Sequence, residues 1–182
     1  PLFLILLFAI LDFGQIYLRW ILAEKATHLA ARLAVVLPPL CPGVPTFNDR
    51  SAGISLDLPF GSSCGEVANL CANPGTISCN GVNAVGDGFD DIFARVSAFL
   101  PTQVQPSNLQ FTYSFANLGF LGGPYVPLVS VELQGDIEVP FITPLGALLQ
   151  TFYGGGQGLD NPSMPTMRAT LPAEDLIEGG PG

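Results

Sequence analysis

The chain is poor in charged residues and nearly free of histidine, and both shortages narrow the chemistry open to it. Asp, Glu, Lys and Arg together make up 12% of its 182 residues, about half the usual share. His28 is the only histidine, and it follows Thr27 in a segment with helical character. A serine hydrolase needs a histidine to accept the proton of its nucleophile, whereas a solvated or packing role suits His28 better. We therefore expect a protein that is not an enzyme, with no cofactor and no evident small-molecule substrate.

Basic residues are the scarcer of the two charge types. Six Lys and Arg stand against fifteen Asp and Glu, which gives a net charge of −9. After residue 40, three arginines are outnumbered by thirteen acidic residues. Such an acidic region repels phosphate groups, so nucleic-acid binding is not expected. Counterions or a basic protein surface suit it better as partners.

Cysteine is absent from most of the chain, and all four cysteines fall within one window at 41–79. Zinc sites usually show a Cys-x-x-Cys pair or a Cys/His set, and neither occurs in this window. Two disulfides are therefore the better interpretation, which places this part of the chain in an oxidising compartment. The sequence permits three pairings and does not choose among them. The residues concerned are Cys41, Cys64, Cys71 and Cys79.

The longest hydrophobic run opens the chain. Residues 2–11 are all apolar, and a helical pattern continues to Leu37, where Pro38 and Pro39 end it. A helix of this span is about 55 Å long at about 1.5 Å per residue, whereas the hydrocarbon layer of a membrane is about 30 Å thick. The first half can therefore lie in lipid, and the second half must project beyond it.

Two other interpretations of this segment compete with a retained membrane anchor. A cleaved signal peptide has a basic start and a short apolar core, whereas this segment has no basic start and its helical pattern runs well past the apolar core. A buried core helix is suggested by Asp12 and Gln15, which interrupt the apolar character. Against it, Tyr17, Arg19 and Trp20 form an aromatic and basic belt of the kind found at a membrane interface. We predict a single-pass anchor in contact with membrane lipid.

Asp12 and a stripe of small residues are the features of this helix that we expect to serve packing and assembly. A carboxylate in lipid is costly, so Asp12 is expected to face protein, face water or pair with a cation. The alternative is that it lies near the membrane interface and is solvated. The alanines recur at helical spacing, which lets another helix approach closely or lets this helix lie flat on its own domain. The expected packing residues are Asp12, Gly14, Ala23, Ala26, Ala30 and Ala34.

The rest of the sequence predicts an α+β domain. Residues 38–88 are rich in Pro, Gly, Ser, Asn and Cys and predict a disulfide-stapled loop region. One amphipathic helix is expected over 89–100, packed on an antiparallel sheet of three or four strands. The expected strands cover 109–115, 125–135 and 165–172, with an edge strand at 136–142, where a proline cannot donate to a ladder. The predicted parts are the helix at 1–37, the loop region at 38–88 and the α+β domain at 89–182.

One cluster of acidic residues is a weak candidate for calcium binding. The segment GDGFDD at 86–91 offers Asp87, Asp90 and Asp91, and carboxylate oxygens suit Ca²⁺. The spacing is not that of an EF-hand loop, and acidic residues at the start of the 89–100 helix are equally well explained by the helix dipole. We therefore predict no metal site.

The N-terminal segment follows a distinctive order of residue types. A proline and an aliphatic stretch precede an acid, Phe-Gly, an aromatic residue and an alanine-rich helix with Ala-Ala-Arg. The residues in this order are Pro1, Asp12, Phe13, Gly14, Tyr17, Ala30, Ala31 and Arg32. This segment resembles TadE-like proteins, minor pilins of the tight-adherence (Tad) secretion and pilus system. A looser similarity follows in FLPTQVQPSNLQFTYS, VPLVSVELQG and MRATLPAEDL.

The resemblance implies a single-span protein of the inner (cytoplasmic) membrane, with a periplasmic C-terminal domain, that enters or primes a type IV pilus-like surface filament. Its partners would be lipid and the helices of other pilins or membrane proteins. Such pilins carry a short leader, a prepilin-peptidase site and an early glutamate, and this sequence starts downstream of where those would lie. A structural minor pilin is the first hypothesis. The second is an accessory single-pass subunit of a larger inner-membrane complex, which its periplasmic domain caps.

Overall fold

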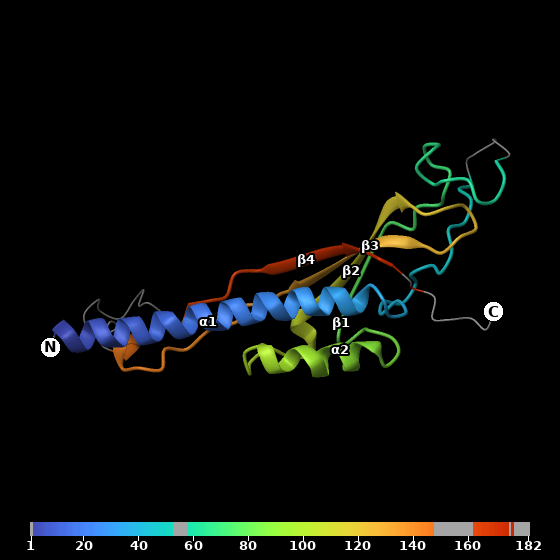
Figure 1. Cartoon of the computed structure of the whole chain (residues 1–182). Coiled ribbons are helices and arrows are strands. Elements are labelled where there is room, and N and C mark those ends of the chain that lie inside the picture. The colour runs from blue at the N-terminus through green and yellow to red at the C-terminus, as the bar shows by residue number, and fades with distance from the viewer. Residues whose placement is uncertain (1, 53–57, 148–161, 175, 177–182) are drawn as a thin grey trace.

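The first element is one long helix, α1, which spans Leu2–Ala34 (Figure 1). The computed structural model describes residues 2–52, 58–147, 162–174 and 176. The helix ends three residues before the predicted end at Leu37. Leu37 precedes Pro38 and is therefore pushed out of the helical conformation, and Pro38 has no N–H to donate to the carbonyl of Ala34. At about 1.5 Å per residue, α1 is about 50 Å long. It is the longest element described and carries both the apolar run and the alanine stripe.

Four antiparallel strands form one sheet in the order β1–β2–β3–β4, which confirms the predicted α+β class. They are β1 (Thr76–Asn80), β2 (Leu109–Leu118), β3 (Val126–Leu133) and β4 (Met167–Pro172). Three of them match predicted strands. β1 lies in the region predicted as loop, because its five residues carry too short an apolar alternation to stand out.

The predicted edge strand at 136–142 is wrong. In this stretch, which the structure describes in full, Glu138 forms only an isolated bridge with Ser163. The place beside β3 is taken by β4, which pairs with β3 from Leu133↔Met167 to Leu128↔Pro172. The chain after β3 instead leaves the sheet, since Gly135 adopts a positive φ of 107° that turns it away.

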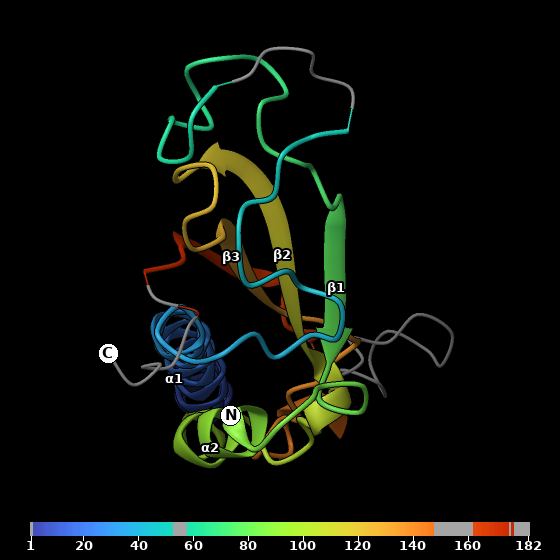
Figure 2. The ribbon, with the colours of Figure 1, turned by 90° about the vertical axis from the view of Figure 1, so that its right-hand side faces the viewer.

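The helix α1 and a second α-helix cover the same face of the sheet. The second, α2 (Gly88–Val96), continues into a 3₁₀ turn at Ser97–Phe99, and another 3₁₀ turn at Pro106–Asn108 leads into β2. Figure 2, which looks along α1, shows α1 and α2 on one side of the strands. The residues of β2 and β3 that point towards the helices are fully buried apolar or aromatic side chains: Leu109, Phe111, Tyr113, Val129 and Val131. In β2 these residues occur at every second position, which is the side-chain period of a strand with one buried face.

The opposite face of the sheet is polar. Register pairs place Ser78 beside Thr112, Thr112 beside Ser130, and Ser130 beside Thr170, so one row of hydroxyl groups crosses all four strands. Within this row the hydroxyl oxygens of Ser130 and Thr170 lie 2.8 Å apart, at hydrogen-bonding distance. A sheet with one apolar and one polar face is the usual solution for an antiparallel sheet covered on one side.

The Cys- and Pro-rich region builds a second, smaller lobe on the connection between β2 and β3, at the end of the molecule away from the start of α1 (Figure 1). Its buried apolar cluster comprises Cys64, Leu70, Cys71 and Leu121. Asn48 joins the lobe to the connection between β2 and β3 through two backbone hydrogen bonds. Its N–H donates to the carbonyl of Gly123, and its carbonyl accepts from the N–H of Gly122, both at 2.8 Å. Gly119 is required beneath it, since a Cβ there would lie 2.7 Å from the Asn48 amide nitrogen and φ is +86°.

Candidate membrane anchor and assembly surface

The first half of α1 stands away from the sheet and exposes its side chains. Leu2–Ala34 is a helix long and apolar enough to span a membrane, and only 6% of its most apolar stretch is buried against the rest of the chain. A soluble core helix would instead be mostly buried. The large apolar side chains left exposed there are Leu2, Phe3, Leu4, Ile5, Leu6, Leu7, Ile10, Leu11, Phe13, Tyr17, Leu18 and Trp20.

The second half of α1 is part of the core of its own domain. The predicted stripe alanines Ala23, Ala26, Ala30 and Ala34 are at most 1% exposed. They belong to the main apolar cluster, and α1 contacts β3, β4 and α2. Of the two uses expected for the stripe, the structure shows the helix lying flat on its own domain. Small side chains allow this because they bring the helix backbone close to the strands.

Gly14 lies on a different face of α1 from Asp12. The two residues are two positions apart, which places them about 200° apart around a helix of 3.6 residues per turn. Gly14 is exposed, and a Cβ at this position would meet no atom within 4 Å. A neighbouring helix backbone can therefore approach α1 closely at this position.

Asp12 is buried, in contrast to the apolar residues around it. Its side chain is 1% exposed. One carboxylate oxygen accepts hydrogen bonds from the backbone N–H groups of Ile142 and Thr143, both at 3.1 Å, and the other accepts from the Thr143 hydroxyl. Among the environments expected for this residue, the structure shows protein contact. The donors come from the connection between β3 and β4.

Sequence reasoning missed these partners of Asp12, although one signal was present. Thr143 is followed by Pro144, and helical residues begin at Leu145. A Thr-Pro pair before an apolar run is a helix-start signal, and a helix start leaves backbone N–H groups that need an acceptor. Nothing in the sequence shows that the acceptor comes from a residue 131 positions earlier.

The aromatic and basic belt lies where α1 reaches the domain. Tyr17 and Trp20 make an edge-to-face contact with ring centroids 6.4 Å apart. Trp20 also lines a shallow groove between α1 and β4, together with Glu24, His28 and Arg168. His28 is thus exposed at a groove that carries charges of both signs, which fits the solvated role expected from the sequence.

All four cysteines are paired in two disulfides, as the sequence predicts. Cys41 pairs with Cys79, and Cys64 pairs with Cys71. The first bridge joins the segment after α1 to β1 within the main core, and the second closes a short loop within the smaller lobe. Each bridge therefore stabilises a different part of the chain.

The acidic segment at 86–91 forms the start of α2. Asp87 is the residue that precedes the helix, and Asp90 and Asp91 lie in its first turn. Across the part of the chain that the structure describes, no group of three or more His, Cys, Asp or Glu side chains is arranged to hold a metal ion. The helix dipole therefore gives a sufficient reason for these three residues.

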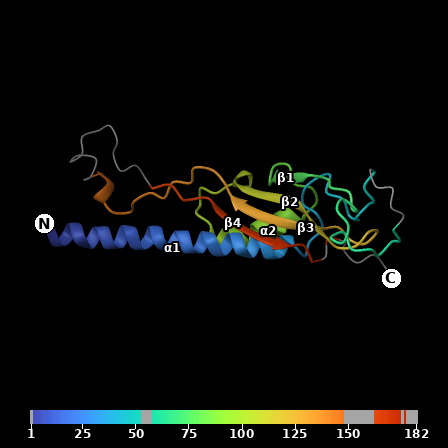
Figure 3. The same cartoon turned by 90° about the horizontal axis from the view of Figure 1, so that it is seen from above.

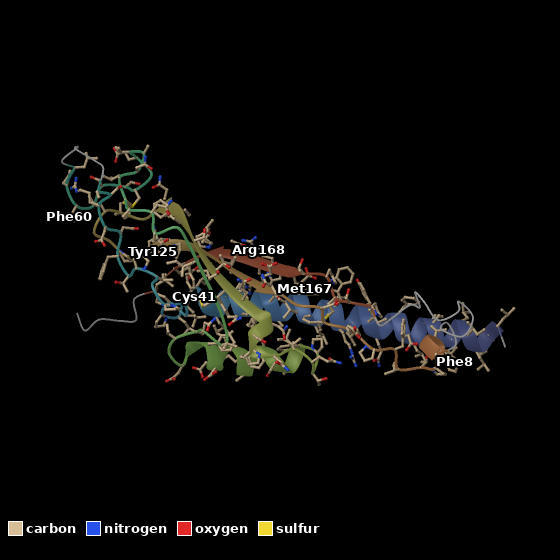
Figure 4. All side chains as sticks on the ribbon, turned by 180° about the vertical axis from the view of Figure 1, so that it is seen from behind. Phe8, Cys41, Phe60, Tyr125, Met167 and Arg168 are labelled. Carbon is tan, nitrogen blue, oxygen red and sulfur yellow. A yellow bond between two sulfur atoms is a disulfide. The ribbon has the colours of Figure 1, made fainter. Side chains whose placement is uncertain are left out.

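The smaller lobe also exposes aromatic side chains. Phe47, Phe60 and Phe120 are 50%, 79% and 56% exposed. They come from three separate segments, and Phe60 packs against Gly122, where a Cβ would lie 2.5 Å from its ring. Phe60 lies at the end of the molecule opposite the apolar half of α1 (Figure 4).

Comparison with known proteins gives a match to the helix described above. No curated protein and no solved structure matches the chain. The matched segment is residues 1–32, which covers the apolar half of α1, Asp12, Gly14 and most of the alanine stripe. Together with the exposed apolar helix, this match indicates a membrane-anchored protein related to the Tad pilus. The family model that matches residues 1–32 is that of TadE-like protein, so the N-terminal segment of this chain is TadE-like.

Proposed function

We propose that the protein is a structural minor pilin, or pilus-assembly subunit, of a Tad-type system. The observation that carries this proposal is the continuity of α1. One unbroken helix has an exposed apolar first half and a second half buried in the core of the following domain. Because no linker separates the two halves, any movement of the apolar half carries the domain with it. A filament subunit needs this property, and the TadE-like match covers both halves.

The proposed location is the inner membrane, with the domain in the periplasm. Two disulfides support this orientation, since they persist in oxidising compartments and are rare in the cytosol. The acidic character of the chain after residue 40 also supports it, because it carries few of the Lys and Arg residues that mark cytoplasmic segments.

In this proposal the chain acts by packing and performs no chemical reaction. The apolar half of α1 lies in lipid before assembly and against other apolar helices afterwards. Lipid tails and Leu-rich helices are similarly apolar, so the exchange depends on close van der Waals packing. Gly14 supplies the point of close approach on the face that the chain itself leaves open.

The test compares Gly14→Leu with Phe13→Leu in cells that carry the full chain. A Cβ at Gly14 would meet no atom within 4 Å, the residue is exposed, and leucine is a better helix former than glycine, so the protein should still insert and fold. We expect Gly14→Leu to lower the amount of the chain in sheared surface filaments at least several-fold, with unchanged amounts in membranes. Phe13→Leu changes an exposed apolar residue for another and should leave both amounts unchanged.

A different result would favour the accessory-subunit hypothesis. In that case the wild-type chain is absent from sheared filaments and co-purifies from membranes with other subunits in fixed stoichiometry. Peptide mass spectrometry of the mature N-terminus in both fractions adds an independent measure. The same processed N-terminus in membranes and filaments supports a pilin, whereas an unprocessed chain found only in membranes contradicts it.

A further inference from the structure

The connection between β3 and β4 extends far from the sheet. Its two legs pair near the sheet, where the N–H of Val139 donates to Pro162 and that of Met164 donates to Ile137. Beyond these bonds the first leg runs along α1 towards the N-terminus (Figure 3). We call residues 139–147 the arm. Its helical turn, which begins at Leu145, lies beside the apolar half of α1 near Phe8 (Figures 1 and 4).

The contact with Asp12 fixes the position of the arm along the anchor. Asp12 precedes Tyr17 by five residues and Trp20 by eight, so it lies about 7 to 12 Å along the helix from the aromatic belt, on the apolar side. Aromatic belts mark the membrane interface. The arm residues Ile142 and Thr143, which bond directly to Asp12, therefore lie at the depth of the hydrocarbon layer.

The hydrogen bonds between the arm and Asp12 satisfy two requirements at this depth. A carboxylate in hydrocarbon needs donors, and irregular backbone in hydrocarbon needs acceptors. Asp12 accepts from two backbone N–H groups and one hydroxyl of the arm. The N–H of Leu145 is directed to the Thr143 hydroxyl oxygen, and Pro140 and Pro144 have no N–H. Asp12 and the arm thus each satisfy part of the other's need for hydrogen bonds in an apolar environment.

The composition of the arm suits contact with lipid. No Asp, Glu, Lys, Arg or His occurs between Glu138 and Asp160 in the sequence. On the arm itself, Ile142 is 57% exposed although it is large and apolar, whereas Leu145 is 5% exposed. The arm therefore presents an apolar side chain outward at the same level as the exposed leucines of α1.

We infer that the arm is a second membrane-contacting element. It lies beside α1 in the leaflet nearer to the domain and contacts the acyl chains of the lipid. This inference rests on the membrane anchoring described above and goes beyond the proposed role in a pilus. The anchor is then a helix with an apolar loop held against it by Asp12. Its cross-section is wider in one leaflet than in the other.

The test uses tryptophan as a depth probe in the full chain. Trp20 is the only tryptophan, so Trp20→Phe gives a background free of it. Three variants are made in this background: Ile142→Trp on the arm, Leu6→Trp on the anchor and Phe60→Trp on the smaller lobe. All three replace exposed apolar residues, so none disturbs the core. Each protein is reconstituted in phosphatidylcholine vesicles, with or without bromine on the acyl chains, which quenches tryptophan fluorescence on contact.

We expect brominated lipid to reduce the fluorescence of Ile142→Trp to an extent similar to that of Leu6→Trp, and to leave Phe60→Trp unchanged. Quenching at Leu6 without quenching at Ile142 would overturn the inference about the arm and leave the anchor intact. Quenching at neither position would overturn both. Strong quenching of Ile142→Trp by aqueous acrylamide, equal to that of Phe60→Trp, would place the arm in water and also contradict the inference.

Discussion

The carboxylate of Asp12 and the backbone N–H of Thr143 are joined by a hydrogen bond of 3.1 Å, although 131 positions separate them in the sequence. The bond links the exposed half of α1 to the connection between two strands of the sheet. The N-terminal helix is therefore held at two places: by its alanine face on the sheet, and by Asp12 on the arm. The two contacts are expected to respond differently to substitution.

Replacing Asp12 with alanine should release the arm and leave the domain folded. The change removes the acceptor of two backbone N–H groups and one hydroxyl, and a buried donor left without a partner costs about 1–3 kcal/mol. Hydrogen exchange in lipid nanodiscs should show the amides of Ile142 and Thr143 exchanging about tenfold to a hundredfold faster. The unfolding temperature of the domain should stay unchanged.

The matched control for this change is Asp90→Ala, which removes an exposed carboxylate in the first turn of α2. It should leave exchange of the arm amides at the wild-type rate. If Asp12→Ala also leaves these rates unchanged, the carboxylate does not hold the arm. Impaired entry into filaments by Asp12→Ala, with the domain folded, would further support a role of this residue in assembly.

Enlarging the alanine face should separate α1 from the sheet. Ala30 is fully buried in the main core, so Ala30→Leu inserts three carbon atoms into a packed contact and should lower the free energy of unfolding by about 1–3 kcal/mol. Ala94→Leu makes the same change at an exposed position of α2 and should alter stability by less than about 0.5 kcal/mol. Urea unfolding followed by circular dichroism measures both. Equal effects of the two variants would contradict the observed packing.

The elements that the sequence predicted well are those with a strong local pattern. The apolar run of α1, the alternation in β2 and β3, and the apolar face of α2 each follow from residue spacing alone. The strand expected at 109–115 falls within β2, whose inner face buries Phe111 and Tyr113. Local patterns also identified the cysteines as disulfide-bonded, although not their pairing, which depends on where β1 lies.

The features that could not be predicted depend on contacts between distant segments. β1 is stabilised by pairing with β2, 30 to 38 positions later, from Thr76↔Ser114 to Asn80↔Gln110, and its own five residues carry little signal. The residues at 136–142 have strand-like composition, yet their hydrogen bonds go to Asp12 and to the returning leg. The alanine stripe was ambiguous for the same reason, because its spacing suits a helix or a sheet as partner.

The two disulfides should contribute unequally to stability. Loop-closure entropy grows with loop length, and the bridges span 38 and 7 positions. On this basis the Cys41–Cys79 bridge should contribute about 4 kcal/mol and the Cys64–Cys71 bridge about 2 kcal/mol. Double substitution of each pair by alanine, followed by thermal unfolding, measures the difference.

The two disulfides should also act on different parts of the molecule. Loss of Cys41–Cys79 removes a link within the main core and should speed amide exchange in β1. Loss of Cys64–Cys71 should speed exchange only in the smaller lobe, whose buried cluster contains that pair. Global destabilisation by loss of the shorter bridge would show that the lobe and the main core unfold as one unit.

Two buried tyrosines should respond oppositely to removal of their hydroxyl groups at neutral pH. The Tyr113 hydroxyl oxygen accepts a hydrogen bond from the backbone N–H of Leu40 at 3.1 Å. Tyr113→Phe leaves this buried N–H without its acceptor and should cost about 1–3 kcal/mol. The Tyr125 hydroxyl is buried and has no hydrogen-bond partner within the described residues. Tyr125→Phe should therefore be neutral or stabilising by about 1 kcal/mol.

The same tyrosines should make the protein sensitive to alkali. Burial raises the pKa of Tyr125 to about 12, and burial also raises that of Tyr113 above its ordinary value of 10.0, against the opposing effect of its hydrogen bond to Leu40. Between pH 10 and 12 the unfolded chain has lost the Tyr125 proton that the folded chain retains. Unfolding is then favoured as pH rises, so the contribution of Tyr125 to stability should be constant below pH 10 and fall above it.

Phenylalanine at Tyr125 removes this titration, so Tyr125→Phe should retain up to about 2 kcal/mol more of its neutral-pH stability at pH 12 than the wild-type chain retains. The measurement is urea unfolding at pH 8, 10 and 12, with each protein compared with itself at pH 8. Tyr17→Phe is the control, since Tyr17 is exposed and its loss should leave the alkaline decline unchanged. An equal decline in Tyr125→Phe and wild type would show that the buried Tyr125 hydroxyl is not the group that limits stability in alkali.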